Sequence, residues 1–162
     1  MLVLGVDPGT AITGYALVRQ EEELDLVDYG AIMTPAGTPL PDRLLVIHTT
    51  LTTLIERYRP EAVAVEELFF SKNVRTAMSV GQARGVVLLA AAQAILPVYE
   101  YKPAEVKQAV AGYGNAPKEQ MQEMVRLLLN LDRVPEPDDA ADAVAVAVCH
   151  LHSARLRQLM DA

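Results

Sequence analysis

The chain has 162 residues, of which 51% are hydrophobic and 22% are charged, and this composition excludes an intrinsically disordered protein. It is long enough to bury a core as one domain, and its lone cysteine, Cys149, excludes a disulfide framework and suits a reducing compartment. The sequence shows neither a secretory leader nor an apolar run that would span a bilayer, so we expect a cytoplasmic protein with a net charge of −7.

Three strands are predicted first along the chain. A short continuous apolar run, typical of a strand buried on both faces, precedes Asp7, and two further runs are typical of a hairpin. The expected strands cover Leu2–Val6, Ile12–Arg19 and Leu24–Met33. After a loop, the spacing of apolar residues predicts a helix over Asp42–Tyr58, which must stop before Pro60.

Strands and helices then alternate before the chain ends in helices. Two more strands are expected over Ala62–Val65 and Val98–Tyr101, with a long helix over Thr76–Leu96 between them. Three further helices are expected over Pro103–Ala111, Lys118–Leu131 and Asp138–Leu159. This order predicts an α/β fold in which a mixed five-stranded sheet carries helices on both faces, with residues 1–162 forming a single domain.

Four carboxylates lie where predicted strands end or a predicted helix begins. Asp7 and Glu66 follow two apolar strands, while Asp139 and Asp142 are three residues apart on one face of the last helix. If that helix crosses the strand ends, the four acids converge and repel one another unless cations neutralise them. Hard oxygen ligands of this kind suit two Mg²⁺ or Mn²⁺ ions, which predicts metal-dependent hydrolysis of a phosphodiester.

Each acid also has a structural interpretation. Asp139 and Asp142, taken alone, are favoured roughly two to one as residues that begin a helix. Asp7 before Pro8 is typical of a turn, whereas nothing local requires an acid at Glu66. Taken together, the four positions favour the catalytic interpretation.

Basic residues gather in the middle of the chain. Between Leu68 and Lys118 there are six basic and two acidic residues, although the whole molecule is acidic. A polyanion responds to the local potential, so the acidic total lowers the expectation of nucleic acid binding without removing it. The basic residues with a possible phosphate-binding role are Lys72, Arg75, Lys107 and Lys118.

Four segments together closely resemble the RuvC family, the bacterial Holliday-junction resolvases. They are LGVDPGTAITGYALV, VAVEELFFSKNVRTAMSVGQARGVVLLAA, EYKPAEVKQAVAGYGNAPKEQMQEMVRLLL and DDAADAVAVAVCHLH, in the order and at the spacing of the family. The resemblance implies a ribonuclease-H-like fold, a homodimer, and symmetric Mg²⁺-dependent nicking of four-way DNA junctions during recombination and DNA repair. It also implies the branch-migration proteins RuvA and RuvB as partners.

The resemblance also assigns roles to individual residues. It implies that the catalytic acids and metal ligands are Asp7, Glu66, Asp139 and Asp142, and that Phe69, Lys107 and Lys118 contact DNA. An exposed Phe69 would stack on an opened base, but strand alternation leaves open whether Phe69 or Phe70 faces outward. Two extra acids, Glu67 and Asp138, leave the register of the metal ligands open by one position.

Three other functions are compatible with parts of the sequence. The segment from Asp7 to Gly14 is similar to the first phosphate loop of actin-like ATPases and sugar kinases, which need a second lobe to enclose a nucleotide. A related nuclease would act on structured RNA, and a non-catalytic protein would bind junctions without cutting them. Nucleotide titration, matched DNA and RNA substrates, and a variant with a neutralised acid separate these functions.

Overall fold

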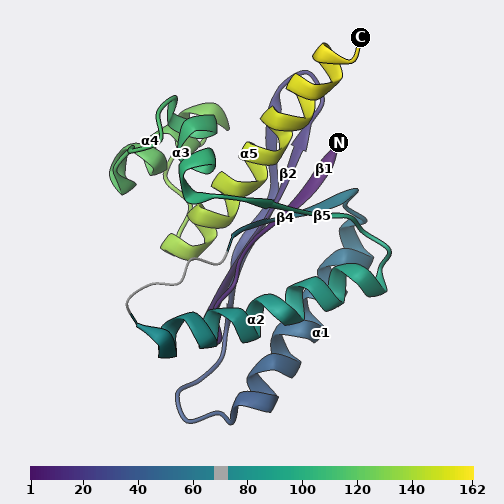
Figure 1. Cartoon of the computed structure of the whole chain (residues 1–162), viewed down its shortest axis with the longest axis vertical. Helices are drawn as coiled ribbons and strands as arrows, with labels where there is room; N and C mark the ends of the chain where they lie inside the picture. The colour runs from purple at the N-terminus through teal and green to yellow at the C-terminus, as the bar shows by residue number, and fades with distance from the viewer. Residues whose placement is uncertain (68–72) are drawn as a thin grey trace.

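A five-stranded sheet forms the centre of the computed structural model, which describes residues 1–67 and 73–162 (Figure 1). Its strands are β1 (Leu2–Asp7), β2 (Ile12–Gln20), β3 (Leu24–Met33), β4 (Ala62–Glu66) and β5 (Val98–Tyr101). They lie in the order β3-β2-β1-β4-β5, with antiparallel pairing among the first three strands and parallel pairing among β1, β4 and β5. The predicted mixed sheet is confirmed.

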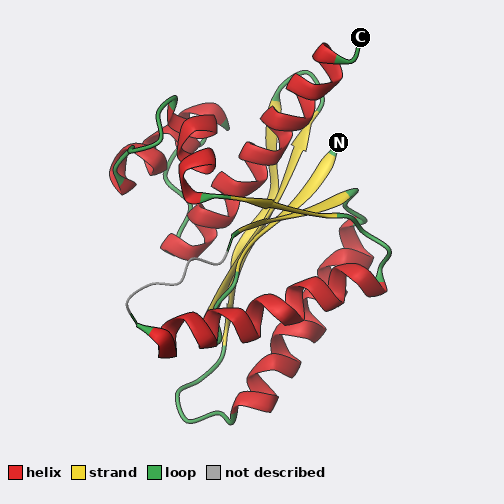
Figure 2. Ribbon diagram, in the orientation of Figure 1, coloured by secondary structure: helices red, strands yellow, loops and turns green. Residues whose placement is uncertain are grey.

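Helices cover both faces of this sheet (Figure 2). Among the described residues they are α1 (Leu40–Tyr58), α2 (Val74–Gln93), α3 (Pro103–Ala111), α4 (Lys118–Leu128) and α5 (Asp138–Met160). One face is covered by α1 and α2, and α5 lies across the other face with α3 and α4 beside it. No helix in the described part of the chain is long and apolar enough to cross a membrane.

The central strands are apolar on both sides because each side faces helices. Val3 and Ala64 point into the cluster that α5 covers, whereas Leu4, Val63 and Val65 point into the cluster beneath α1 and α2. All five side chains are at most 1% exposed. The continuous apolar runs in the sequence therefore result from a strand that packs against two layers.

Two glycines let α5 lie directly on the strands. A Cβ atom at Gly5 would overlap the carbonyl oxygen of Ala143 and come within 2.9 Å of the Ala147 Cβ atom. A Cβ atom at Gly14 would overlap the backbone carbonyl of Asp139 and lie 2.9 Å from the amide nitrogen of Ala140. The first two turns of α5 are thus held against β1 and β2 at a distance that only glycine allows.

Two predicted helices end earlier than expected. The helix expected over Thr76–Leu96 ends at Gln93, because Ile95 adopts a left-handed φ of 58° just before the segment that leads to Pro97. The helix expected to continue to Leu131 ends at Leu128, where Asn130 has a φ of 51°. Asparagine tolerates this conformation well, so the second ending has a local cause.

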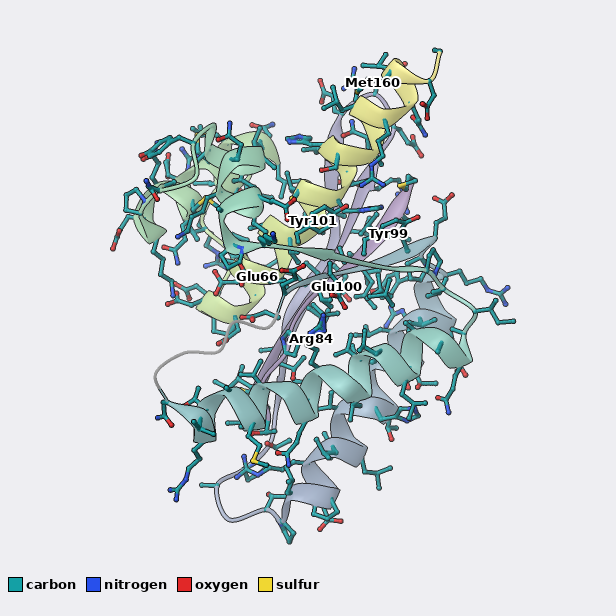
Figure 3. The ribbon with its side chains drawn as sticks, in the orientation of Figure 1. Glu66, Arg84, Tyr99, Glu100, Tyr101 and Met160 are labelled. Atoms are coloured by element: carbon teal, nitrogen blue, oxygen red, sulfur yellow. The ribbon has the colours of Figure 1, made fainter. Side chains whose placement is uncertain are left out.

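Polar contacts join α2 and α5 to the edge strand β5. The guanidinium of Arg84, only 9% exposed as a residue, forms an ion pair with Glu100, and Figure 3 shows the two side chains facing one another. On the other face, Tyr101 Oη and His150 Nδ1 share a buried hydrogen bond of 2.6 Å. Burial lowers the pKa of His150 to about 4, so this imidazole is neutral and serves the packing of the core.

The β2–β3 hairpin carries acidic residues at the far end of the sheet from Asp7. Leu2 pairs with Arg19 and Asp7 pairs with Gly14, so the end of β2 lies beside the beginning of β1. The turn that follows exposes Glu21, Glu22 and Glu23 to solvent. The ends of the strands therefore differ in surroundings, with a solvated acidic hairpin at one end and the four predicted acids at the other.

Candidate active site

Asp7 and Glu66 leave the sheet at the same edge. Each is the last residue of its strand, and β1 and β4 are parallel neighbours in which Val6 pairs with Val65. Their apolar strands are buried on both faces, so the chain turns polar only where it emerges from the core. The topology therefore brings together two acids that are 59 residues apart in the sequence.

The beginning of α5 adds the other two acids. The protonated carboxyl of Asp7 donates a side-chain hydrogen bond to Asp139. Asp142 lines a cleft together with Asp7 and Glu66, whereas Asp139 is not among the residues of that lining. The close packing at Gly14 positions the backbone of Asp139. The structure thus brings together Asp7, Glu66, Asp139 and Asp142, while their catalytic and metal-binding roles remain predictions.

Burial and mutual repulsion disfavour the charged forms of Asp7, Glu66 and Asp142. Burial, followed by the charges of Asp142 and Asp139, raises the pKa of Asp7 to about 8. Partial burial and Asp142 raise the pKa of Glu66, and the nearby Lys107 opposes that rise. Partial burial also raises the pKa of Asp142, against the opposing effect of Lys118. A cation between the acids would remove the cost of ionising them.

The donor set fits a divalent metal ion of the hard class. Four carboxylates offer only oxygen ligands, which Mg²⁺ and Mn²⁺ prefer. Burial and the neighbouring carboxylates raise the pKa of Asp7, and a bound cation would offset both effects by stabilising the ionised acid. Within residues 1–67 and 73–162, no three acidic, histidine or cysteine side chains are gathered closely enough to form a ready-made metal site.

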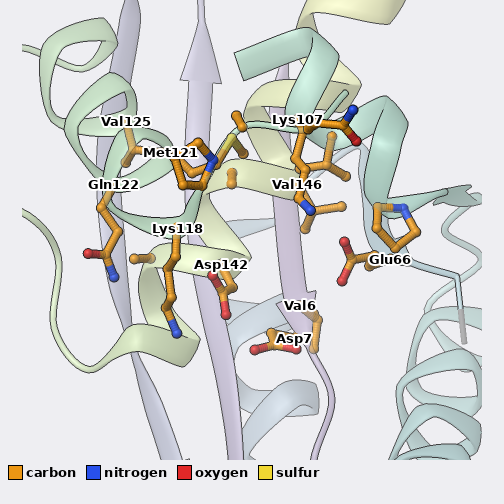
Figure 4. Close-up of a pocket in the computed structure, with 17 residues that line it drawn as sticks. Val6, Asp7, Glu66, Lys107, Lys118, Met121, Gln122, Val125, Asp142 and Val146 are labelled. Carbon is orange, nitrogen blue, oxygen red and sulfur yellow. The ribbon is translucent and has the colours of Figure 1, made fainter. Parts of the chain in front are cut away.

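The cleft beside the acids has a volume of about 430 Å³ and lies between α3, α4 and α5 (Figure 4). Lys107 from α3 and Lys118 from α4 line its walls. Figure 4 shows the Lys118 side chain beside Asp142, and the Lys107 side chain across the cleft beside Val146, toward Glu66. This arrangement suits a phosphodiester, because the lysines attract its charge while the acids lie next to it.

The two extra acids take up other positions. Asp138 forms an ion pair with Lys118, with 2.8 Å between Oδ2 and Nζ, and accepts a hydrogen bond of 3.2 Å from Gln122 Nε2. Lys118 holds the pKa of Asp138 below its usual value. Glu67 is not among the residues that line the cleft, and its backbone N–H donates to Tyr101 at 2.7 Å. Glu66 therefore lines the cleft whereas Glu67 does not, and Asp139 is the acid at the start of α5 that lies against Asp7.

The remaining predicted contacts lie away from the cleft or outside the described residues. Arg75 is exposed in the first turn of α2 and does not line the cleft. Phe69 and Lys72 lie outside the described residues, as does the choice between Phe69 and Phe70.

Sequence reasoning missed the inner part of the cleft. Met121 and Val125 lie four residues apart on α4, and Ala141 and Ala145 lie four residues apart on α5; all four line the cleft. The same spacing in the sequence indicates only an apolar helix face. Asn115 and Gln122 are also in the lining, and no pattern distinguished them from other surface amides.

Replacing Asp7 by Asn is expected to stabilise the protein at alkaline pH when divalent cations are absent. An acid whose folded pKa is raised from 3.8 to about 8 makes folding less favourable as pH rises between those values, and the full cost is present above pH 8. Asn removes that cost, which at about 1.4 kcal/mol per pKa unit is at most about 6 kcal/mol, so we expect a clear gain in stability at pH 9 and almost none at pH 4. Thermal unfolding of both proteins in chelator across this pH range measures the difference, and equal pH dependence would contradict it.

Three comparisons with known proteins agree. A family model described as "Crossover junction endodeoxyribonuclease RuvC" matches residues 3–150. A protein of that description from Chloroflexus aggregans is 63% identical, with 95% of this chain and 94% of the relative covered, and one from Desulfitobacterium hafniense is 59% identical, with 99% and 98% covered. The solved structure of Thermus thermophilus RuvC in complex with Holliday junction substrate matches with a TM-score of 0.93 at 42% identity, covering 97% of this chain and 96% of that chain.

Proposed function

The chain belongs to the RuvC family of crossover junction endodeoxyribonucleases, and we propose that it resolves four-way DNA junctions with Asp7, Glu66, Asp139 and Asp142 as its catalytic acids. The observation that carries the assignment is the convergence of these acids, from three distant segments, at one edge of the sheet beside Lys107 and Lys118. A buried acid with a raised pKa weakens the folded state at neutral pH, and the two lysines lie in the lining of the same cleft. Both are useful for holding and hydrolysing a phosphodiester.

The reaction is hydrolysis of one phosphodiester in each of two opposed strands. Water adds to phosphorus, the bond to the 3′ oxygen breaks, and a 5′-phosphate and a 3′-hydroxyl result. Two Mg²⁺ or Mn²⁺ ions held by the four acids would supply Lewis-acid stabilisation of the attacking and leaving oxygens. Asp7 is the most buried of the acids in the cleft and anchors the group, whereas Glu66 and Asp142 are exposed where the DNA strand enters.

The two lysines hold the strand against the acids. Lys107 is half-buried on α3 and lies close enough to Glu66 to oppose the rise in its pKa. The Lys118 side chain is 52% exposed, and solvent screens its ion pair with the exposed Asp138. Lys118 can therefore exchange Asp138 for a phosphate oxygen at little cost.

A nicking assay tests the proposed function. The protein is incubated with a labelled synthetic four-way junction, with Mg²⁺ present or absent, and in parallel with a duplex and a structured RNA of matched length. We expect paired nicks in the junction only when Mg²⁺ is present, and much slower cleavage of the other two substrates. Faster cleavage of the RNA would favour the RNA nuclease considered from the sequence.

We also propose that the protein acts as a homodimer in the cytoplasm and works with RuvA and RuvB. Two opposed nicks in a substrate of near two-fold symmetry require two copies of the site related by a two-fold axis. The outer side of α2 supports this assembly: Met78 is 65% and Leu89 is 52% exposed, and a Cβ atom at Gly85 would meet nothing within 4 Å. Sedimentation of the wild type and of Leu89→Glu tests the dimer, which the variant should weaken.

Replacing Lys118 by Ala is expected to weaken junction binding several-fold and to reduce its dependence on salt. A lysine that contacts one phosphate contributes about one unit to the slope of log affinity against log salt concentration, so the slope should fall by about 1. Junction binding measured from 50 to 200 mM salt without divalent cations gives this slope. Arg19→Ala, at the hairpin end of the sheet, is the matched control and should leave the slope unchanged. An unchanged slope for Lys118→Ala would remove Lys118 from the DNA contact.

A further inference from the structure

Helix α2 is joined to the sheet by polar side chains at two points. Apart from Arg84, the buried residues of this helix are small or apolar, namely Ala77, Ala83, Val87, Ala90 and Ala91. The half-buried Ser79 shares a hydrogen bond with Thr10, with 2.5 Å between the two hydroxyl oxygens. One and a half turns further along the helix, the buried Arg84 forms its ion pair with Glu100. Two polar contacts therefore interrupt an otherwise apolar helix face.

The first contact reaches the loop that follows Asp7. Thr10 lies three residues after Asp7 in this loop. Thr13 closes the loop, because its Oγ1 donates to the Gly9 carbonyl at 2.6 Å and accepts from the Gly9 N–H at 3.2 Å. Thr34 Oγ1 also donates to the Thr10 carbonyl at 2.7 Å. Since the loop is tied at each of these points, a displacement of Thr10 would move the end of β1 with it.

The second contact reaches the strand beside Glu66. Glu100 and Tyr101 of β5 are the register partners of Val65 and Glu66 at the end of β4. Figure 3 shows the Arg84 side chain reaching from α2 toward Glu100. Because β5 is an edge strand and pairs with β4 alone, its position at this point determines where β4 ends. Helix α2 is therefore tied to both of the strands that end in an acid.

Neither contact lies in the cleft. The described lining contains none of the four residues that make the two contacts. Helix α2 also lies on the opposite face of the sheet from α3, α4 and α5, which carry the two lysines and the acids of the last helix (Figure 1). Any effect of these contacts on the reaction must therefore act through the positions of the strand ends.

Contacts of this kind determine position more than they add stability. Taking the Arg84 guanidinium out of water is costly, and a well-packed apolar side chain of similar volume is often just as stable as a buried ion pair. The hydrogen bond between the two hydroxyls likewise replaces hydrogen bonds to water, so its net contribution is small. Both contacts nevertheless require their atoms to meet at a defined distance and angle. They therefore fix where α2 lies along the strand ends.

We propose that Ser79 and Arg84 are positioning residues for the reaction. Through them, α2 holds the ends of β1 and β4 at the separation at which Asp7 and Glu66 can share metal ions. The proposal rests on the proposed function, because it takes these two acids as metal ligands. Loss of either contact should weaken metal binding and slow nicking without changing the affinity for the junction.

Substitutions that keep the packing but remove the polar groups test this proposal. Arg84→Met keeps a long side chain without its charge, and Ser79→Ala removes only the hydroxyl. We expect each folded variant to nick a junction about tenfold more slowly than the wild type and to bind Mn²⁺ several-fold more weakly in calorimetry without DNA. Junction affinity in chelator should not change, because Lys107 and Lys118 stay in place. Arg84→Lys, which keeps the charge, should recover most of the activity.

The controls remove the same chemical groups from α1. Arg57→Met takes away an exposed guanidinium in the last turn of that helix. Thr53→Ala takes away a hydroxyl that donates to the Thr49 carbonyl of the same helix. Both control variants should bind Mn²⁺ and nick junctions as the wild type does.

Double variants show whether the two contacts themselves carry the effect. Adding Thr10→Val to Ser79→Ala, or Glu100→Gln to Arg84→Met, should cause no further loss, because the members of each pair share one interaction. If Arg84→Met does not fold, the hydroxyl pair decides the question. Wild-type Mn²⁺ affinity and nicking in the single variants, or additive losses in the double variants, would overturn the positioning proposal alone. Failure of the wild type to nick a junction would instead count against the proposed function, and the Mn²⁺ titration would still test the positioning.

Discussion

Replacing Glu66 by Gln is expected to reduce nicking of a four-way junction by at least about 10³-fold while junction affinity stays within a few-fold. The amide keeps the size of the side chain but removes one of the negative charges that would hold the metal ions. The change leaves intact Lys107 and Lys118, the residues that we propose to contact the DNA. Single-turnover nicking with saturating protein and Mg²⁺, together with a binding titration in chelator, separates the two effects.

The neighbouring acid provides the control for this experiment. Glu67→Gln makes the same chemical change one residue further along the chain, and Glu67 does not line the cleft. We expect near wild-type nicking from this variant. The opposite pattern, with Glu67→Gln inactive and Glu66→Gln active, would show that the metal ligands are shifted by one position. Wild-type nicking by both variants would show that neither Glu66 nor Glu67 is a catalytic acid.

Replacing Gly14 by Ala is expected to destabilise the protein by about 2–3 kcal/mol and to slow nicking by the folded fraction about 10²-fold. The added methyl group would overlap the backbone carbonyl of Asp139, and backbone cannot rotate away as a side chain can. The first turn of α5 must therefore move off the sheet, carrying Asp139 away from Asp7. Urea unfolding measures the stability, and nicking per mole of folded protein measures the displacement.

A glycine with ordinary surroundings is the control for this change. A Cβ atom at Gly114 would meet its nearest neighbours at 3.7 Å, which is normal van der Waals contact, so Gly114→Ala should change stability little. Full activity in a destabilised Gly14→Ala protein would show that the position of Asp139 is not critical. Unchanged stability would show that α5 can move away from the strands without loss.

The sequence predicted the strands and the place of the acids well, for a physical reason. A strand buried on both faces must be apolar throughout, so an acid that follows it marks the point where the chain reaches solvent, as at Asp7 and Glu66. The ends of α2 and α4 were less predictable. Ile95 is an ordinary helix residue by composition and is 90% exposed; its left-handed conformation belongs to the helix end at which the Leu96 N–H donates to the Ala91 carbonyl.

Contacts between distant segments could not be predicted from the sequence. Gly5 and Gly14 are unremarkable in a strand pattern until α5 is seen lying on them. Asp138 is typical of a helix start, and its pairing with Lys118 depends on how α4 and α5 meet. The apolar part of the cleft lining has the same sequence pattern as any core-facing helix side, so its place in the cleft follows only from the tertiary structure.

The acidic hairpin at the far end of the sheet gives the molecule an electrical polarity that bears on how quickly it finds DNA. Negative charge on Glu21, Glu22 and Glu23 repels an approaching polyanion, whereas the lysines at the opposite end would attract it once divalent ions neutralise the acids beside them. The resulting torque turns the diffusing protein so that its cleft faces the DNA when the two meet. This effect acts over about one Debye length, roughly 8 Å in physiological salt. The acidic hairpin thus limits unproductive encounters. Association of the protein with DNA at low ionic strength should be faster than for a variant whose hairpin is neutral.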